Sequence, residues 1–589
     1  MLQRLRHPLR RSLIRKRLRQ NQLDIENGWT VELKDAKGVT VSKQLANFVA
    51  WPVREILLDD GLSTTRYIDI QGLLTGNKPL PTIRLSDIEF LGDLKKSLPR
   101  LWGIEVIIKR GAVDRVREAI QVLGKDRQQE TIYTCTGWRD INGQRVFLHA
   151  GGAVAGDGVR VDLSEGGETL GRYVLPLTCD DQEQAASKVF SLFDMLAPHI
   201  AYPMFAITFL SPLCSILREE GAVIDFVPYL VGRSQNGKSV IAALFLSFFG
   251  DFDKNSFPAK FNFSISSIEK ICFILKDVLT VVDDYYPAQT SKEQAAMKEV
   301  AQHLARAYGD STARGRMGAG GRMRQSWFPR GAAIATGETR PDIGESGMAR
   351  YVFIDVTREH SDYEALLELQ SHKRFLAEFM VIFIEWVAAN RDRIPALFQE
   401  TYRQAKGRLK SPEYSGRINE SVSKLFGGLE VFFSFAKEQG FLGQEEYERH
   451  GQHAFEALKA VLEQNAGTLR AEMPSQMFLA AMAEIIASGQ GHLCATNAAE
   501  LPEHHFGCYD DEYAYLFPSL CYGAAKNLVE SQGKRFPIGD KMLWRHLRDE
   551  GIIETSSDAR HRNTVQKRLP CLGGNAPDVL KLKKSFLGL

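Results

Sequence analysis

The stretch of sequence that decides the fold reads Gly232-Arg233-Ser234-Gln235-Asn236-Gly237-Lys238-Ser239. It satisfies the pattern G-x-x-x-x-G-K-[ST] at every fixed position. An apolar run at 222–231 leads into it, and an apolar helical pattern follows from Val240. Because the Walker A phosphate loop requires this order of strand, loop and helix, the sequence predicts a nucleoside triphosphate site.

The chemistry of this loop assigns a role to each of its parts. Gly232 and Gly237 let backbone amides turn inward, where these amides and the positive end of the following helix bind phosphate oxygens. We expect Lys238 to reach the β and γ phosphates and the Ser239 hydroxyl to bind the magnesium ion between them. The predicted nucleotide contacts are Gly232, Gln235, Asn236, Gly237, Lys238, Ser239 and Val240.

A second motif follows, in which the apolar run 279–282 ends at Asp283 and Asp284. This is the Walker B arrangement; without the Walker A loop the same strand would be interpreted as plain core. We expect Asp283 on the magnesium side and Asp284 beside the attacking water, which it would orient or deprotonate, although many motors carry the longer Glu there. The guanine-reading elements N-K-x-D and T-K-x-D are absent from the sequence. The predicted cofactors are therefore ATP and Mg²⁺.

The order of apolar runs predicts the fold class. Runs at 222–231, 278–282, 332–335 and 351–356 alternate with helical patterns. Strands that alternate with helices indicate a parallel sheet covered on both faces, so we predict an α/β multidomain protein. The predicted units are a basic arm (1–20), a β-rich domain (21–180), a P-loop ATPase core (181–400), a helical lid subdomain (401–470) and a winged helix (471–589).

Two local predictions test this organisation. In the β-rich domain, the runs 132–138 and 144–149 flank Asn142-Gly143, a pair that suits a type I′ hairpin turn, and 106–109 reads as a further strand. Near the C-terminus, 564–569 and 579–582 form a candidate two-stranded wing after three predicted helices.

Composition narrows the class of protein. At 589 residues, with 44% hydrophobic and 25% charged residues, the chain is globular and too long for one core. The net charge of +2 excludes a surface that is basic throughout, but it permits local basic patches. The 8 cysteines form no C-x-x-C pair and no finger-like spacing with histidines, so we expect a cytoplasmic protein without structural zinc. The most apolar stretches are interrupted, so we expect no membrane span.

Two basic segments are candidates for nucleic-acid contact. The first twenty residues carry eight Lys or Arg and no acid; a nucleic-acid-binding arm and a frayed, solvated terminus both remain open, and a targeting peptide is disfavoured. Residues 306–330 interleave arginines and glycines with one acid, Asp310. This segment suits a hairpin whose arginines contact DNA phosphates, and a flexible solvated loop is the alternative. The candidate contacts are Arg314, Arg316, Arg322 and Arg324.

Two further features depend on context. Arg350 directly precedes the apolar run 351–356; such an arginine can project toward a neighbouring subunit's γ-phosphate, and a surface salt bridge is the equally open alternative. A basic cluster within 534–568 covers the proposed winged helix. Winged helices bind either duplex or single-stranded DNA, but they also dock proteins, so the fold alone does not decide.

Taken together, these motifs resemble the AAA+ helicases, similar to minichromosome-maintenance motors, that mobile cassette elements and phages encode. The resemblance spans roughly 120–589. The residues that carry it are Thr136-Gly137-Trp138, Phe147-Leu148-His149-Ala150-Gly151-Gly152, Pro212-Leu213 and Thr336-Gly337-Glu338.

The resemblance implies a ring, a homo-hexamer, with ATP between subunits and a hairpin at 312–330 that grips single-stranded DNA in the central channel, with fork duplex nearby. It also implies that Thr336 is the sensor 1 residue, Arg350 the trans-acting arginine finger and Arg417 a sensor 2 arginine. A replication initiator or loader would be a partner. The chain departs from the family in its Asp-Asp Walker B pair and in its first 120 residues.

The expected function is an ATP-dependent DNA helicase that translocates on and unwinds DNA in the replication of a mobile element or phage. The alternatives are a nucleotide-switched assembly ATPase and a DNA-binding initiator whose ATPase controls only its oligomeric state.

Overall fold

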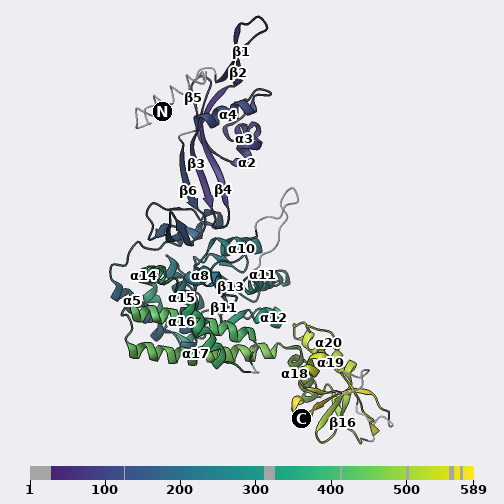
Figure 1. The fold of residues 1–589 in the computed structure, drawn as a ribbon. Coiled ribbons are helices and arrows are strands. Elements are labelled where there is room, and N and C mark those ends of the chain that lie inside the picture. Colours follow the sequence, from purple (N-terminus) through teal and green to yellow (C-terminus); the bar gives the residue numbers. More distant parts are fainter. Residues whose placement is uncertain are drawn as a thin grey trace.

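The computed structural model describes residues 28–124, 127–310, 326–411, 414, 416–498, 503–555, 563–570 and 575–589. Figure 1 shows three parts in succession: an N-terminal sheet with helices beside it, a central body that carries a second sheet among many helices, and a smaller C-terminal unit. The arrangement is mixed α/β, as expected from the alternating apolar runs.

The N-terminal part is built on a five-stranded sheet with the order β10-β6-β3-β4-β5. A separate antiparallel pair, β1 with β2, extends beyond it (Figure 1). The strands are β1 (Trp29–Lys34), β2 (Thr40–Ala46), β3 (Phe48–Asp59), β4 (Thr64–Leu74), β5 (Lys78–Ser86), β6 (Gln128–Tyr133) and β10 (Arg160–Val161); the helices are α2 (Asp87–Gly92), α3 (Leu94–Trp102) and α4 (Val113–Leu123).

Local predictions in this part have different outcomes. The hairpin at Asn142-Gly143 is confirmed: both residues have positive φ, and β7 (Gly137–Ile141) pairs with β8 (Gln144–His149), which in turn pairs with β9 (Gly152–Val154). The run 132–138 is not one strand, because its first residues belong to β6 in the other sheet. The strand expected at 106–109 is wrong: only an isolated bridge from Ile108 to Ala46 forms there.

A helical segment precedes the phosphate loop. It contains α5 (Gln182–Phe190), α6 (Leu192–Met195), α7 (Pro198–Leu210), the 3₁₀ turn η4 (Ser211–Leu213) and α8 (Cys214–Glu219). Pro212 does not interrupt it, because the proline occupies the start of η4. The interruption expected at Pro212 is therefore wrong, and among the described residues Pro198–Glu219 is long and apolar enough to span a membrane by length and composition alone. However, 94% of its most apolar window is buried inside the protein, as in a core helix.

The central sheet is parallel throughout and has the order β12-β13-β14-β11-β15. Its strands are β11 (Val227–Val231), β12 (Ala259–Lys260), β13 (Leu279–Tyr285), β14 (Ala332–Gly337) and β15 (Tyr351–Asp355), with α9 (Lys238–Leu246), α10 (Ile265–Ile274) and α11 (Ser291–Gly309) between them. Chain order differs from spatial order, since β14 is inserted between β11 and β13. Because the strands are parallel, the carboxyl ends of β11, β13 and β14, where the motif residues lie, meet at the same edge of the sheet.

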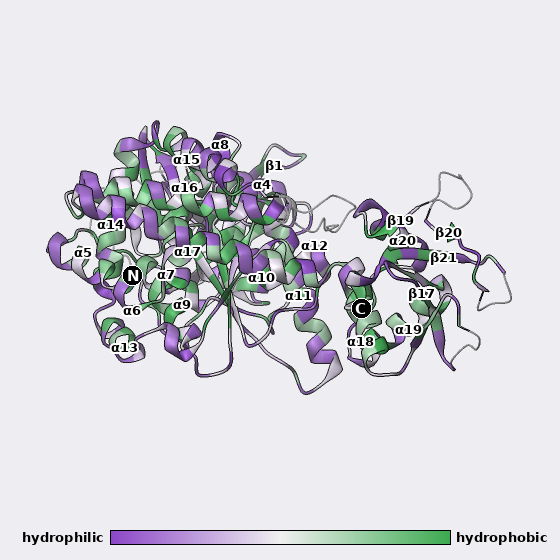
Figure 2. Cartoon of the chain, turned by 90° about the horizontal axis from the view of Figure 1, so that it is seen from below, coloured by the Kyte–Doolittle hydropathy of each residue, from purple (hydrophilic) through white to green (hydrophobic). Residues whose placement is uncertain are grey.

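Long helices follow the sheet, as the apolar spacing predicts. They are α13 (Tyr363–Ser371), α14 (Arg374–Asn390), α15 (Ile394–Arg408), α16 (Gly416–Glu438) and α17 (Gln444–Ala471), whereas the short α12 (Gly344–Met348) lies between β14 and β15. Asn465 of α17 ties this layer to β15, because its side chain donates to the Phe353 carbonyl and accepts from the Phe353 amide, both at 2.8 Å. In Figure 2 the hydrophobic segments of α7 and α9 lie within this body, where their side chains form one continuous core with the sheet.

The C-terminal unit combines three helices with a mixed sheet of order β16-β17-β18-β21-β19, and β20 also pairs with β21. The predicted pairing of the two wing strands is confirmed by β20 and β21. The elements are α18 (Pro474–Ala487), β16 (His492–Ala495), β17 (His505–Tyr509), β18 (Tyr513–Leu516), α19 (Pro518–Ser531), α20 (Asp540–Asp549), β19 (Ile553–Glu554), β20 (Val565–Gln566) and β21 (Asp578–Lys583).

Candidate nucleotide site

The phosphate loop lies between the end of β11 and the start of α9. A Cβ at Gly232 would approach the Val356 carbonyl oxygen to 2.1 Å, so only glycine fits there. Gly237 has φ of 85° and stands at the N-cap of α9, a left-handed conformation that glycine adopts without strain. The amides at the start of α9 are thereby left open to a ligand at the positive end of the helix.

Lys238 is held over this loop. Its Nζ donates to the Arg233 carbonyl at 2.8 Å, which uses one of its three N–H groups, and the residue is 8% exposed. Burial lowers the pKa of Lys238, and three nearby carboxylates act in the opposite direction, the strongest from Glu338, followed by Asp283 and Asp284. Lys238 thus places an ammonium group with free N–H donors in an open pocket, where it can bind phosphate.

The Walker B carboxylates are joined to β14 by Thr336. The Thr336 hydroxyl donates to Asp283 Oδ1 at 2.6 Å and accepts from the Asp284 amide at 3.1 Å. Burial raises the pKa of Asp283, partly offset by the Thr336 hydrogen bond. Asp284 is exposed and has a left-handed backbone, φ 71°, where the pairing of β13 with β14 shifts register. The two aspartates thus have different environments.

These groups line one pocket with a volume of about 450 Å³. The pocket brings together most of the predicted site: Gln235, Asn236, Gly237, Lys238, Ser239, Val240, Asp283, Asp284 and Thr336. The remaining lining residues were not predicted as site residues, namely Ser234, Lys254, Gly337, Glu338, Arg358, Ser361 and Tyr363. Gly337 and Glu338 stand in the motif Thr336-Gly337-Glu338, so their signal is present in the sequence. The residues after β15 have no such signal, because only the sheet order places them beside the loop.

Two oxygen-bearing side chains of the pocket suit a magnesium ion. The Ser239 hydroxyl and the Asp283 carboxylate both line the pocket, and hard oxygen ligands of this kind are those that Mg²⁺ prefers. Burial raises the pKa of Asp283, so a cation bound beside this carboxylate would stabilise its charged form.

Arg350 and Arg417 lie away from this pocket. The Arg350 carbonyl accepts from the amide of Val227, the first residue of β11, so Arg350 stands at the edge of the sheet opposite the phosphate loop. Its guanidinium bonds Asp310 Oδ1 at 2.7 Å. Arg417 Nη1 reaches the carbonyl of Gly309 at 3.5 Å. Both arginines therefore meet the end of α11, and their roles toward a neighbouring subunit stay predictions.

The candidate DNA contacts Arg314, Arg316, Arg322 and Arg324 lie outside the described residues, as do the basic arm and most of the expected hairpin. Arg330, at the end of the arginine-rich segment, is 4% exposed and unsuited to DNA. Its Nε donates to the Phe273 carbonyl at 2.6 Å and its Nη1 to the Asp60 carbonyl at 2.7 Å. It joins the N-terminal sheet to the central body.

Part of the C-terminal basic cluster is exposed on α20. Leu543, Trp544 and Leu547 are buried, whereas Lys541 and Arg545 are exposed on the opposite face.

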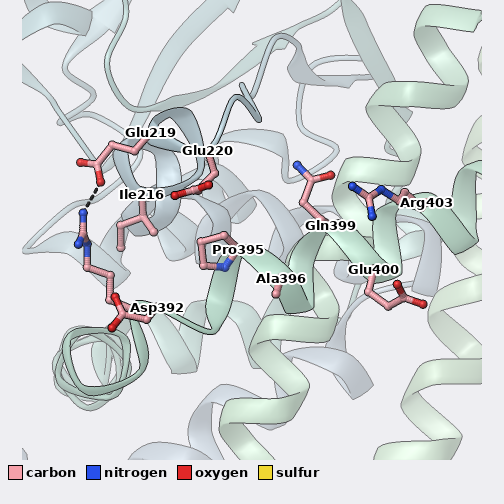
Figure 3. Close-up of a pocket in the computed structure, with 10 residues that line it drawn as sticks. Ile216, Glu219, Glu220, Asp392, Pro395, Ala396, Gln399, Glu400 and Arg403 are labelled. Atoms are coloured by element: carbon pink, nitrogen blue, oxygen red, sulfur yellow. Dashed lines mark hydrogen bonds and ion pairs between the residues drawn. The ribbon is translucent and has the colours of Figure 1, made fainter.

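A larger cavity, about 770 Å³, lies between the end of α8 and the start of α15 (Figure 3). Figure 3 shows Glu219, Glu220, Gln399, Glu400 and Arg403 around it. Glu219 is engaged in an ion pair with Arg391. The cavity has no phosphate loop, so its size alone does not make it the nucleotide site.

Comparisons with known proteins concern the fold. A scan of protein-family models and a search of curated proteins find no match. Among solved structures, the chain is similar to one described as "SCCmec type IV Cch - active helicase", at 12% identity and a TM-score of 0.57, over 96% of this chain and 98% of that one. A JCV helicase structure matches at 16% identity and a TM-score of 0.19, over 42% of this chain and 73% of that one, which is too weak to carry an argument.

Proposed function

We propose that the chain is an ATP-hydrolysing DNA helicase with an AAA+ core, a helical lid and a C-terminal winged helix. The observation that carries the proposal is the pocket lined by Lys238, at the start of the helix that follows β11, and by Asp283 and Thr336 of the neighbouring strands β13 and β14. The AAA+ assignment is supported by the inserted strand β14, which brings Thr336 between the Walker A and Walker B strands, where the resemblance expects sensor 1.

The residues of the pocket would have different roles in ATP hydrolysis. The loop amides and Lys238 would bind and orient the β and γ phosphates, and the charge of Lys238 would stabilise the negative charge on the transferred phosphoryl group. Ser239 and Asp283 would hold Mg²⁺, which supplies further neutralisation of the phosphate charge when bound. Thr336 fixes the Asp283 carboxylate through its 2.6 Å hydrogen bond.

The helicase part of the proposal is supported by the fold that this chain shares, over nearly its whole length, with a structure described as an active helicase. That structure's SCCmec origin favours a mobile cassette element as the DNA served, with action in the cytoplasm. A hexameric ring would place Arg350 and Arg417 beside a neighbour's nucleotide, and Arg314, Arg316, Arg322 and Arg324 in the channel, on single-stranded DNA. The exposed Lys541 and Arg545 of α20 would contact fork duplex, and a replication initiator or loader would assist assembly.

Strand displacement on a forked DNA with ATP tests the proposal. The wild type should displace the strand, and Lys238→Ala should not, because the variant lacks the ammonium that binds phosphate. Displacement that persists in Lys238→Ala would refute the motor.

The second candidate function, a nucleotide-switched assembly ATPase, would show ATP hydrolysis that DNA stimulates but no displacement by either protein. The variant Arg322→Ala with Arg324→Ala separates the two further: for a motor that grips DNA in its channel, we expect DNA stimulation to disappear while basal hydrolysis stays.

A further inference from the structure

Glu338 is a carboxylate in the pocket to which neither Walker motif assigns a role. It follows the last residue of β14, the strand inserted between the Walker A and Walker B strands. Its amide donates to the Tyr285 carbonyl of β13 at 2.7 Å, which fixes the backbone at this point. A side chain that leaves the sheet here enters the pocket between the phosphate loop and the Walker B carboxylates.

The Glu338 carboxylate is not used by the fold. It is half-buried, and within the part of the chain that the structure describes its side chain has no hydrogen bond or ion pair. Glu338 lines the same pocket as Lys238, Asp283 and Asp284. Since Lys238 is expected beside the γ-phosphate, a carboxylate in this pocket lies close to where hydrolysis would occur.

Asp284 is less suited to the water-activating role that its motif position suggests. It is one methylene shorter than a glutamate, and its left-handed backbone places it at a register shift in β13. It is also exposed, so water and salt screen its charge. Glu338, which directly follows the neighbouring strand β14, carries the longer side chain and is less exposed.

We propose that Glu338, rather than Asp284, orients and deprotonates the water that attacks ATP in this protein. This rests on the proposed ATPase function. As the water oxygen bonds to the γ-phosphorus, its proton passes to the Glu338 carboxylate, the bond from phosphorus to the β,γ-bridging oxygen breaks, and ADP and inorganic phosphate leave. A general base of this kind contributes roughly 10²- to 10⁴-fold.

The test compares isosteric variants of both carboxylates in the full chain. ATP hydrolysis and ATP affinity are measured for wild type, Lys238→Ala, Glu338→Gln, Glu338→Asp and Asp284→Asn. We expect Glu338→Gln to lower kcat about a hundredfold or more with ATP affinity within about threefold of wild type. Glu338→Asp, which keeps a carboxylate but shortens it, should retain more activity than Glu338→Gln, and Asp284→Asn should lose less than about tenfold.

The outcomes separate this inference from the function on which it rests. If the wild type shows no hydrolysis that depends on Lys238, the proposed function itself fails, and the inference with it. If hydrolysis is present but Asp284→Asn loses it while Glu338→Gln keeps it, only the inference is overturned. Equal losses of affinity and kcat in Glu338→Gln would likewise overturn it, because they indicate a role in balancing the charge of Lys238 during binding.

Discussion

The two edges of the central sheet use similar polar residues in different ways. At the carboxyl edge, Lys238 and Glu338 face a pocket and leave hydrogen-bonding capacity unused. At the amino edge, the fully buried Asp277 accepts from the Ser215 amide and hydroxyl, the Trp138 amide and the Lys276 ammonium. A buried charge that the protein satisfies stabilises the fold, whereas one left open to a cavity is available to a ligand.

Arg350 gives the strongest test of this difference between the two edges. It lies at the amino edge and has an ion-pair partner, but it is predicted to act on the ATP of a neighbouring subunit. We expect Arg350→Ala to lower ATP hydrolysis about a thousandfold, because the transition-state charge loses a cation. Asp310→Ala, which removes only the intrachain ion pair, serves as the matched control and should leave hydrolysis within about threefold of wild type. Steady-state hydrolysis of the assembled protein measures both.

Mixed assemblies show whether this arginine acts between subunits. Subunits with Lys238→Ala still supply Arg350, and subunits with Arg350→Ala still supply Lys238, so mixing the two inactive variants should restore part of the hydrolysis. If the mixture stays inactive and Asp310→Ala matches Arg350→Ala, the arginine is a structural ion-pair partner, and the contrast between the edges holds.

Asp277 tests the structural side of the comparison. Asp277→Ala removes the carboxylate and leaves the Lys276 ammonium and several donors without their acceptor, so we expect a loss of about 3–5 kcal/mol in the free energy of unfolding. Chemical denaturation measures it. Asp284→Ala, at an exposed position, is the control and should change stability by less than about 0.5 kcal/mol; equal effects would mean that burial does not distinguish the edges.

His149 adds a pH dependence to the same region, since it ends β8 in the small sheet that joins the amino edge through Trp138. Its Nδ1 accepts from the Gly151 and Leu175 amides, both at 3.2 Å, and burial lowers the pKa of His149 to about 4. In the unfolded chain this imidazole binds a proton near pH 6.5, whereas in the folded chain it binds one only near pH 4. The free energy of unfolding therefore falls as the pH is lowered from about 6.5 to about 4.

The loss attributable to His149 is at most about 3 kcal/mol. Denaturation midpoints at pH 7 and pH 4.5 should differ more for the wild type than for His149→Gln. An equal difference in both proteins would assign the acid sensitivity to other groups.

The smallest predicted effect concerns Tyr363 at the carboxyl edge. It lies beside the phosphate loop, with its ring 3.4 Å from where a Cβ at Gly237 would stand, and it is 37% exposed. Tyr363 is the aromatic side chain among the residues that line the pocket, so the base is expected to stack on it. Tyr363→Ala should weaken ATP binding about tenfold and leave tripolyphosphate binding unchanged, and Tyr363→Phe should bind both as the wild type does. Competition binding measures this, and equal loss for both ligands would exclude stacking.

The sequence alone was sufficient where a motif fixes local chemistry. The glycines of the phosphate loop, the strand that carries Asp283 and the turn at Asn142-Gly143 each depend on a few consecutive residues, and periodicity located the parallel strands and most helices. It failed at 106–109, where an alternating run finds no partner strand beyond a single bridge. It also failed at 132–138, which was predicted as one strand. The first residues of that run pair with β3, and only the last residues pair with β8.

What only the tertiary structure decided is which residues from distant segments share an environment. Thr336 and Glu338 enter the pocket because β14 is inserted between two strands that precede it in the chain, and Tyr363 enters because its helix follows β15. Arg330 belongs to an arginine-rich segment by sequence, yet its guanidinium is enclosed between Phe273 and Asp60. Spacing along the chain determines local conformation, but the order of strands in the sheet determines which charges meet a ligand and which meet the protein.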